Sequence, residues 1–147
     1  GTLWLGTYFG GVNYFNPEYE IYTRYSYSSN EKKGLSNPVV GRTIEDRDGN
    51  LWIGTEGGGL NYYNRRTREF KWYRPQEGRN SISHNNVKAL YYDADKEIIW
   101  IGTHLGGLNK LDIRSGHFTH YRMEEGNPNT LPSDIIRDII PYKSLLI

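Results

Sequence analysis

The sequence reads Leu51-Trp52-Ile53-Gly54-Thr55 near its middle, and the same pattern occurs as Leu3-Trp4-Leu5-Gly6-Thr7 and as Ile99-Trp100-Ile101-Gly102-Thr103. Consecutive tryptophans of this pattern are 48 positions apart both times. A Gly-Gly-Val/Leu-Asn motif follows each copy at a constant offset, at residues 10–13, 58–61 and 106–109. Copies that share so many anchors at one period indicate an internal structural repeat.

The rest of each period is typical of short β-strands. In the second period we expect strands over 39–45, 51–55 and 60–64 and a fourth that carries Phe70, Trp72 and Tyr73. In the third period the corresponding ranges are 87–93, 98–103, 107–112 and 118–122. No window places apolar residues at i, i+3, i+4 and i+7, so the pattern does not support helices.

Four strands in a repeat of this length predict a β-propeller blade. A small antiparallel sheet cannot cover both of its faces alone, so we expect each blade to stack on the next, with Trp4, Trp52 and Trp100 at the interfaces. The sequence therefore predicts an all-β partial ring of about three blades. The expected division is a partial blade over 1–34, blades over 35–80 and 81–126, and the start of another over 127–147.

Composition excludes several classes of protein. The 147 residues carry 18 basic and 17 acidic side chains, a balance unlike that of a dedicated nucleic-acid binder. There is no cysteine, which excludes disulfides and thiolate metal sites. No apolar run is long enough to span a membrane, and the chain opens in the middle of the repeat pattern, so we expect it to be part of a longer protein.

The stretch from Asp46 to Asn61, with Gly49-Asn50 before Leu-Trp-Ile-Gly-Thr and Gly58-Gly59-Leu60-Asn61 after it, resembles the two-component regulator propeller repeat. The resemblance implies the periplasmic sensor region of a hybrid two-component system whose membrane-anchored parent carries a histidine kinase. It also implies that the ligand is an oligosaccharide. The third copy departs from the pattern, because Lys96-Glu97-Ile98 stands where the Gly-Asn turn is expected, and the chain contains no kinase or membrane part.

Metal and catalytic motifs receive little support from the sequence. Asp46-x-Asp48-x-Asn50 resembles the start of a calcium loop, but residue 57 is Gly57 where that loop needs glutamate, so an Asp-Gly turn is the better interpretation. His117 and His120 are three apart on an expected strand and point to opposite faces. No nucleophile elbow or phosphate loop is present, and no pattern brings two carboxylates together as glycosidases require. We expect no catalysis, no metal and no cofactor.

Ligand binding is the favoured role, at loops that vary between constant anchors. Sugar recognition uses aromatic faces together with charged groups, and the candidate ligand-binding residues that supply them are Tyr8, Phe9, Arg42, Glu56, His104 and Arg137. Ordinary solvated loops remain the alternative. The arginine-rich turn at 65–68 and Arg114 are expected on the opposite face, as solvated surface or as a contact for an anionic glycan.

Two exposed strand edges predict a homo-oligomer in which Leu3–Thr7 of one copy pairs with Ile135–Ile140 of another. Two further functions remain open beside ligand sensing. One is a structural or protein-interaction propeller that dimerises without binding a small ligand, and the other is a degenerate glycoside-processing propeller.

Overall fold

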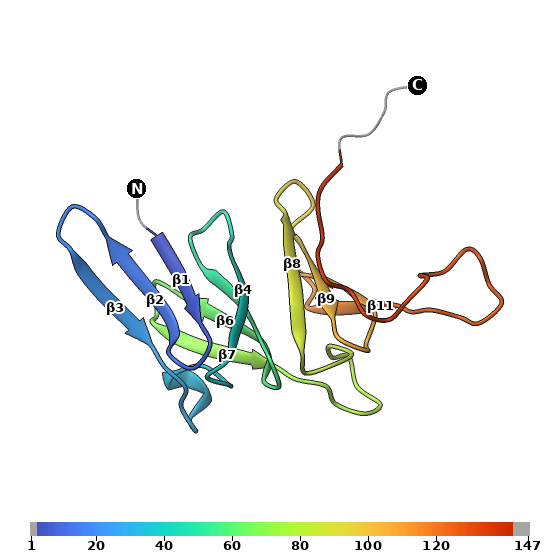
Figure 1. The fold of residues 1–147 in the computed structure, drawn as a ribbon, viewed down its shortest axis with the longest axis horizontal. Helices are drawn as coiled ribbons and strands as arrows, with labels where there is room; N and C mark the ends of the chain where they lie inside the picture. The colour runs from blue at the N-terminus through green and yellow to red at the C-terminus, as the bar shows by residue number, and fades with distance from the viewer. Residues whose placement is uncertain (1–2, 143–147) are drawn as a thin grey trace.

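The computed structural model describes residues 3–142, which form three antiparallel sheets without an α-helix (Figure 1). The first sheet contains β1 (Leu3–Thr7), β2 (Gly11–Asn16) and β3 (Ile21–Tyr25). The second contains β4 (Val40–Glu45), β5 (Leu51–Thr55), β6 (Gly59–Asn64) and β7 (Glu69–Tyr73). The third contains β8 (Val87–Asp93), β9 (Ile98–Thr103), β10 (Leu108–Asp112) and β11 (His117–Tyr121). A short 3₁₀-helix, η1 (Glu31–Lys33), precedes β4. The predicted all-β class is confirmed.

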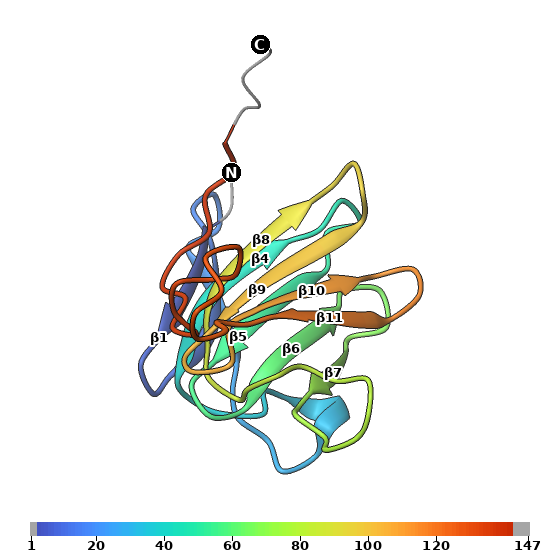
Figure 2. The same ribbon diagram turned by 90° about the vertical axis from the view of Figure 1, so that its right-hand side faces the viewer.

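Each sheet is a meander in which consecutive strands pair, and the register follows the repeat. Trp52 lies opposite Tyr62 as Trp4 lies opposite Tyr14, while Thr55 and Thr7 lie opposite the glycines that begin β6 and β2. β4 and β8, which begin the second and third sheets and are called the first strands, lie side by side, and β1 lies next to β4. The three sheets spread outward from this row of strands (Figure 1). Viewed from the side of the third sheet, its strands run in nearly the same direction as those of the second (Figure 2).

Residues 135–140, expected as a first strand, do not form one. Ile135 makes an isolated bridge with His104, and the Ile136 N–H donates to the Thr103 carbonyl at 3.0 Å. A strand needs a continuously bonded neighbour, which β4 finds in β5 and β8 finds in β9. Within the described residues, 136–140 has no such neighbour and remains extended chain.

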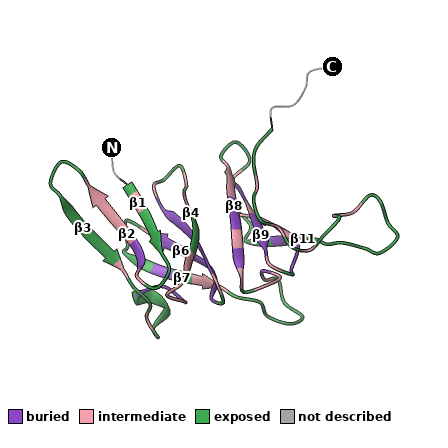
Figure 3. Cartoon of the chain, viewed as in Figure 1, coloured by how far each residue is buried: buried purple, intermediate pink, exposed green. Residues whose placement is uncertain are grey.

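The alternation of side chains along β5 divides the core into two clusters. Leu51 and Ile53 face the first sheet, together with Tyr63 and Phe70, whereas Trp52 faces the third sheet, as expected from a period of two residues. The second sheet is therefore covered on both faces, and all five residues of β5 are buried. The two outer sheets each expose one face, as the green β1 and β3 in Figure 3 show.

The tryptophans occupy equivalent positions within their own sheets. Each ring lies about 6 Å from the tyrosine 21 positions later: 6.1 Å for Trp4 and Tyr25, 5.8 Å for Trp52 and Tyr73, and 6.0 Å for Trp100 and Tyr121. The repeat thus specifies a repeated side-chain arrangement on one face of each sheet and not only repeated strands.

The motif glycine lets adjacent sheets approach closely. A Cβ added at Gly54 would lie 2.6 Å from a methyl carbon of Val87 in β8, and one at Gly102 would lie 2.5 Å from a methyl carbon of Ile136. Any side chain at these positions would push the next sheet away. The glycine of Leu-Trp-Ile-Gly-Thr is therefore explained by packing between sheets.

A buried polar contact joins the second and third sheets to the segments that lead into them. The Oδ1 of Asn61 accepts the Ser36 N–H at 2.8 Å, and its Nδ2 donates to the Ser36 hydroxyl at 2.8 Å. Asn109 makes the same pair of bonds with Ser83, at 2.9 and 2.7 Å. The asparagine that ends the Gly-Gly-x-Asn motif thus fixes the chain entry to the sheet, because it satisfies a backbone donor that would otherwise be buried without a partner.

None of the helical turns in residues 3–142 has the length or apolar character to traverse a bilayer.

Candidate ligand-binding site

The loops that follow β5 and β9 make corresponding backbone hydrogen bonds to the segments that lead into β4 and β8. The Glu56 N–H donates to the Val39 carbonyl and the His104 N–H donates to the Asn86 carbonyl, both at 3.0 Å. Glu56 and His104 thereby lie at corresponding ends of β5 and β9, each beside a residue that leads into the next first strand. The sequence predicts that both residues belong to loops on one face of the scaffold.

A pocket of about 340 Å³ opens beside His104 and is lined by Lys88, His104, Ile135 and Arg137. Its residues come from β8, from the loop after β9 and from the extended segment after residue 134. The Lys88 Nζ lies 2.5 Å from a carboxylate oxygen of Glu56, so Glu56 borders the same group of charges. Three of the six predicted residues, Glu56, His104 and Arg137, are therefore brought together.

Arg42 adds a fourth predicted residue to this neighbourhood. Its guanidinium lies 3.7 Å from the carboxylate of Asp138, the residue that follows Arg137. Because both side chains are more than half exposed, this ion pair adds little stability. The contact between Arg42 and Asp138 nevertheless shows that β4 and the segment after β11 come close to each other, although they are far apart in sequence.

Tyr8 and Phe9 are not part of this pocket. They are 66% and 70% exposed at the loop after β1 and contact each other edge to face, with ring centroids 4.6 Å apart. Their loop corresponds to those of Glu56 and His104 in the repeat, but its aromatic rings face solvent.

Lys88 is the pocket residue that sequence reasoning did not identify. It occupies a β-bulge, where the register between β8 and β9 shifts between Val87 and Ala89. A bulged side chain escapes the alternation that assigns strand residues to one face or the other. Lys88 and Arg137 each follow the apolar residue that packs on a motif glycine, a relation that only the packing between the sheets reveals.

Histidine 84 supports the loop that carries His104. Burial lowers the pKa of His84, and the neighbouring His104 and Arg122 lower it further. Its Nδ1 accepts the Asn86 N–H at 3.1 Å, which requires the unprotonated nitrogen. His84 is therefore a neutral structural residue, and His104 is the imidazole that faces the pocket.

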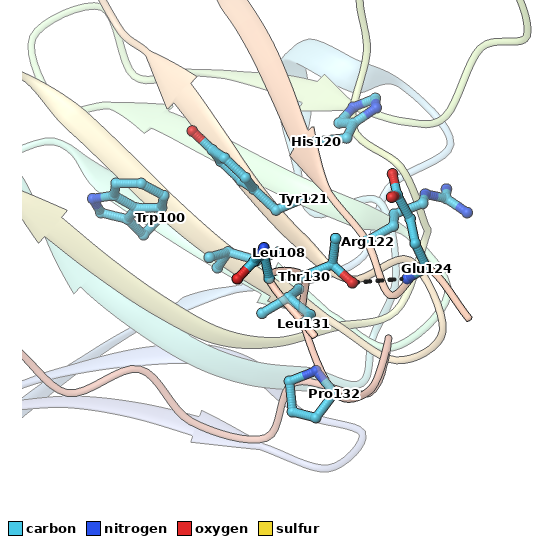
Figure 4. A pocket seen from close by; sticks show the side chains of 10 residues that line it. Trp100, Leu108, His120, Tyr121, Arg122, Glu124, Thr130, Leu131 and Pro132 are labelled. Atoms are coloured by element: carbon cyan, nitrogen blue, oxygen red, sulfur yellow. Dashed lines mark hydrogen bonds between the residues drawn. The ribbon is translucent and has the colours of Figure 1, made fainter. Parts of the chain in front are cut away.

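A larger hollow of about 550 Å³ lies on the outer face of the third sheet, with Trp100, Leu108, Tyr121 and Leu131 among its lining residues (Figure 4). An aromatic face with Arg122 and Glu124 at its rim resembles a sugar site. However, the equivalent residues Trp52, Leu60, Tyr73 and Ile82 belong to the core between the second and third sheets. The hollow therefore corresponds to the face of the second sheet that the third sheet covers, and we do not assign it to a ligand.

The residues considered for metal binding have structural roles. Asp46 accepts the N–H groups of Asp48 and Asn50 at 3.0 and 2.9 Å, and its second oxygen accepts the Trp52 indole N–H at 3.1 Å. Its carboxylate thus closes the β4–β5 turn and anchors the tryptophan. Among residues 3–142, no three His, Asp or Glu side chains are placed to share an ion.

The family model described as two-component regulator propeller matches residues 34–57 and 81–104, the two ranges that contain β4–β5 and β8–β9 with the segments that lead into them. Among curated proteins, none is significantly similar to this chain.

Several solved structures share the fold. The extracellular domain of a protein described as the hybrid two-component system BT3049 from B. thetaiotaomicron aligns over 93% of this chain and 19% of its own, with 27% identity and a TM-score of 0.78. The corresponding domain of BT4673 from the same organism aligns over 95% and 17%, with 24% identity and a TM-score of 0.71. PorZ, a surface component of the type-IX secretion system of Porphyromonas gingivalis, aligns over 95% and 22%, with 19% identity and a TM-score of 0.62.

The chain spans about a fifth of the length of these structures, and the likeness to the second and third shows the fold alone. The predicted propeller architecture is confirmed by this likeness together with the stacked sheets. The chain is thus a stack of propeller-type sheets, within which residues 34–57 and 81–104 are similar to two-component regulator propeller repeats.

Proposed function

We propose that this chain is part of the periplasmic ligand-sensing region of a membrane-anchored hybrid two-component protein that carries a histidine kinase, and that it has no catalytic activity of its own. The observation that carries the proposal is the likeness, over 93% of the chain, to the extracellular domain of a protein described as a hybrid two-component system. The matched family model supports the same role.

We further propose that the ligand is an oligosaccharide and that it contacts the pocket of Lys88, His104 and Arg137, bordered by Glu56 and Arg42. Charged and imidazole groups supply the directional hydrogen bonds that sugar hydroxyls need, and Tyr8 and Phe9 offer exposed rings at the corresponding loop of the first sheet. Since the pocket joins residues from three segments, a ligand there would favour one arrangement of the sheets. Its effect on signalling is limited by its difference in affinity between two arrangements.

Binding is tested by calorimetric titration of the chain with a panel of oligosaccharides. We expect at least one to bind, and we expect Arg137→Ala to weaken its binding about tenfold or more, because a charged hydrogen bond is lost. Arg79→Ala is the matched control, since Arg79 is exposed and lies outside the lining of this pocket. A panel without a single binder, or equal weakening by both variants, would remove the proposed site.

The second candidate, a propeller that assembles with copies of itself, is supported by the two terminal sheets. Within the described residues the first sheet lacks the strand that corresponds to β4, and residues 137–140 pair with no strand. The outer face of the first sheet carries Leu3, Leu5 and Tyr22, which are 52%, 42% and 63% exposed. These residues correspond to Leu51, Ile53 and Phe70, which are buried in the second sheet.

We therefore propose that the 135–140 segment of one copy pairs with β1 of another, so that the first sheet of that copy covers the Trp100 hollow. The expected result is a molar mass above that of one chain, measured by light scattering over a range of concentrations. Leu5→Glu and Trp100→Glu should each restore the monomer, whereas Tyr19→Glu, at an exposed position outside these faces, should not. A monomer at the highest concentration would rule out this assembly.

A further inference from the structure

A second pocket lies between the first and second sheets, distant in sequence from the residues proposed above. Its volume is about 510 Å³, within the range of ligand pockets. Thr23, Tyr25, Tyr63 and Phe70 supply hydroxyl groups and aromatic surface, and Lys33, Arg65 and Arg68 supply the charge. No carboxylate is among its lining residues, so three cations face one concave surface.

Local structure fixes the positions of these cations. In η1, Glu31 accepts the Trp72 N–H at 2.6 Å and Lys32 pairs with Glu69 at 3.3 Å, which holds the turn against β7 and directs Lys33 to the pocket. Arg65 lies with its guanidinium 5.6 Å from the centre of the Trp4 ring and 3.4 Å from a Glu45 oxygen. None of the ion pairs in the described part of the chain includes Lys33 or Arg68.

The fold does not require arginine at positions 65 and 68. At the equivalent pocket between the second and third sheets, Ile113 and Gly116 stand at these two positions, and the basic lining residues Lys71, Arg74 and Arg114 come from other positions. Position 68 has a left-handed backbone, with φ 59° for Arg68, 71° for Gly116 and 51° for Glu20 at the equivalent turn of the first sheet. Glycine adopts this conformation without cost, whereas arginine does not. Arg68 is thus present at a turn whose backbone favours glycine.

The tyrosines complete a set of hydrogen-bond donors. Tyr63 is 5% exposed, and its ring centroid lies 4.7 Å from that of Tyr25. Burial, together with the adjacent Tyr63, raises the pKa of Tyr25 to about 12, against the opposing effect of Arg65 and Arg68. Its hydroxyl therefore keeps its proton at neutral pH. The partly dry aromatic walls also strengthen the attraction between the cations and an anion.

We infer that this pocket binds an oxyanion group, namely a sulfate, phosphate or carboxylate carried on a small polar molecule. Lys33 and Arg68 supply charge that no ion pair of residues 3–142 neutralises, Arg65 supplies a positioned guanidinium, and the tyrosine hydroxyls supply directional donors. Planar guanidinium groups and hydroxyls are suited to the several acceptor oxygens of such a group. This pocket shares no lining residue with the Arg137 pocket, so a failed test of oxyanion binding here and a failed test of oligosaccharide binding there are distinguishable.

The test is a titration of the chain, at low ionic strength, with inorganic sulfate, inorganic phosphate and glucuronate, followed by NMR or calorimetry, with glucose as the neutral comparison. We expect saturable binding of at least one oxyanion and none of glucose. Which of the three binds tightest identifies the source of the group. Arg68→Gly, which reproduces the residue of the equivalent turn, and Lys33→Gln should each weaken binding about tenfold.

Arg66→Ala and Arg79→Ala are the controls, since Arg79 is exposed and lines neither pocket. Arg66 lies in the same turn but does not line the pocket, and its replacement removes an equal charge. Retained binding in both controls, with folded variants of unchanged melting temperature, supports the site. Absence of saturable binding, or an equal loss in Arg66→Ala and Arg68→Gly, overturns it, because the effect would then be diffuse surface charge.

Discussion

Replacement of Trp52 by alanine is expected to lower the free energy of unfolding by about 3–5 kcal/mol, the range typical of large aromatic residues removed from a core. Trp52 is 2% exposed and contacts Tyr62 and Tyr73 at centroid distances of 4.7 and 5.8 Å. Its indole N–H also donates to Asp46, so the variant leaves a carboxylate oxygen of the β4–β5 turn without that donor. The loss therefore combines a cavity with a weakened turn.

Trp100→Ala is the matched comparison, because Trp100 occupies the same position in the third sheet but lines an open hollow. We expect this variant to cost about 1 kcal/mol, since less area is removed from water in the folded chain. Chemical denaturation at low protein concentration measures both values without burial of Trp100 by a second copy. Equal losses for the two variants would contradict the assignment of Trp52 to an interface between sheets.

The second large effect is expected for Asn61→Ala, at about 3 kcal/mol. Asn61 is fully buried and holds both the N–H and the hydroxyl of Ser36. The variant removes the acceptor of a buried backbone donor, and Ser36 itself is only 5% exposed, so water cannot readily replace the lost partner.

Asn13→Ala provides the control within the same motif. Asn13 is only half-buried, and its side chain makes one long bond of 3.4 Å, to the Leu5 carbonyl. We expect it to cost less than about 1 kcal/mol. The midpoint of denaturant unfolding, compared at constant m-value, distinguishes the two asparagines. An equal loss of unfolding free energy in both variants would show that the bonds between Asn61 and Ser36 add no stability beyond that of the half-buried Asn13.

Much of the fold was predictable because two periods act together in this sequence. The 48-residue repeat locates each sheet, and the two-residue alternation within Leu51–Thr55 assigns Trp52 to one interface and Ile53 to the other. The observed bounds of β1, β5, β8 and β9 equal those expected. The strand predicted over 135–140 is not formed, because strand formation depends on a bonded neighbour and not only on the segment's own residues.

The candidate site was less accessible to sequence reasoning. Glu56 and His104 could be located because they follow a repeated motif. The contribution of Lys88 depends on a bulge, and the contact of Arg42 with Asp138 depends on how far the row of first strands curves. Neither bulges nor curvature leave a mark in residue spacing. The basic pocket at Arg68 could not be predicted from the sequence, because the left-handed backbone that Arg68 shares with Gly116 is a property of the folded turn.

The two faces of every sheet are unlike each other, and this gives the stack a direction. Trp4 and Trp52 face the following sheet, whereas Leu51 and Ile53 of the second sheet and Ile99 and Ile101 of the third face the preceding one. Such an interface is heterologous, so two copies cannot meet through identical faces and a twofold axis is excluded for this contact. Units that join in this way add head to tail, and they end either as a closed ring or as a filament, depending on whether the rotation between units returns to its starting point.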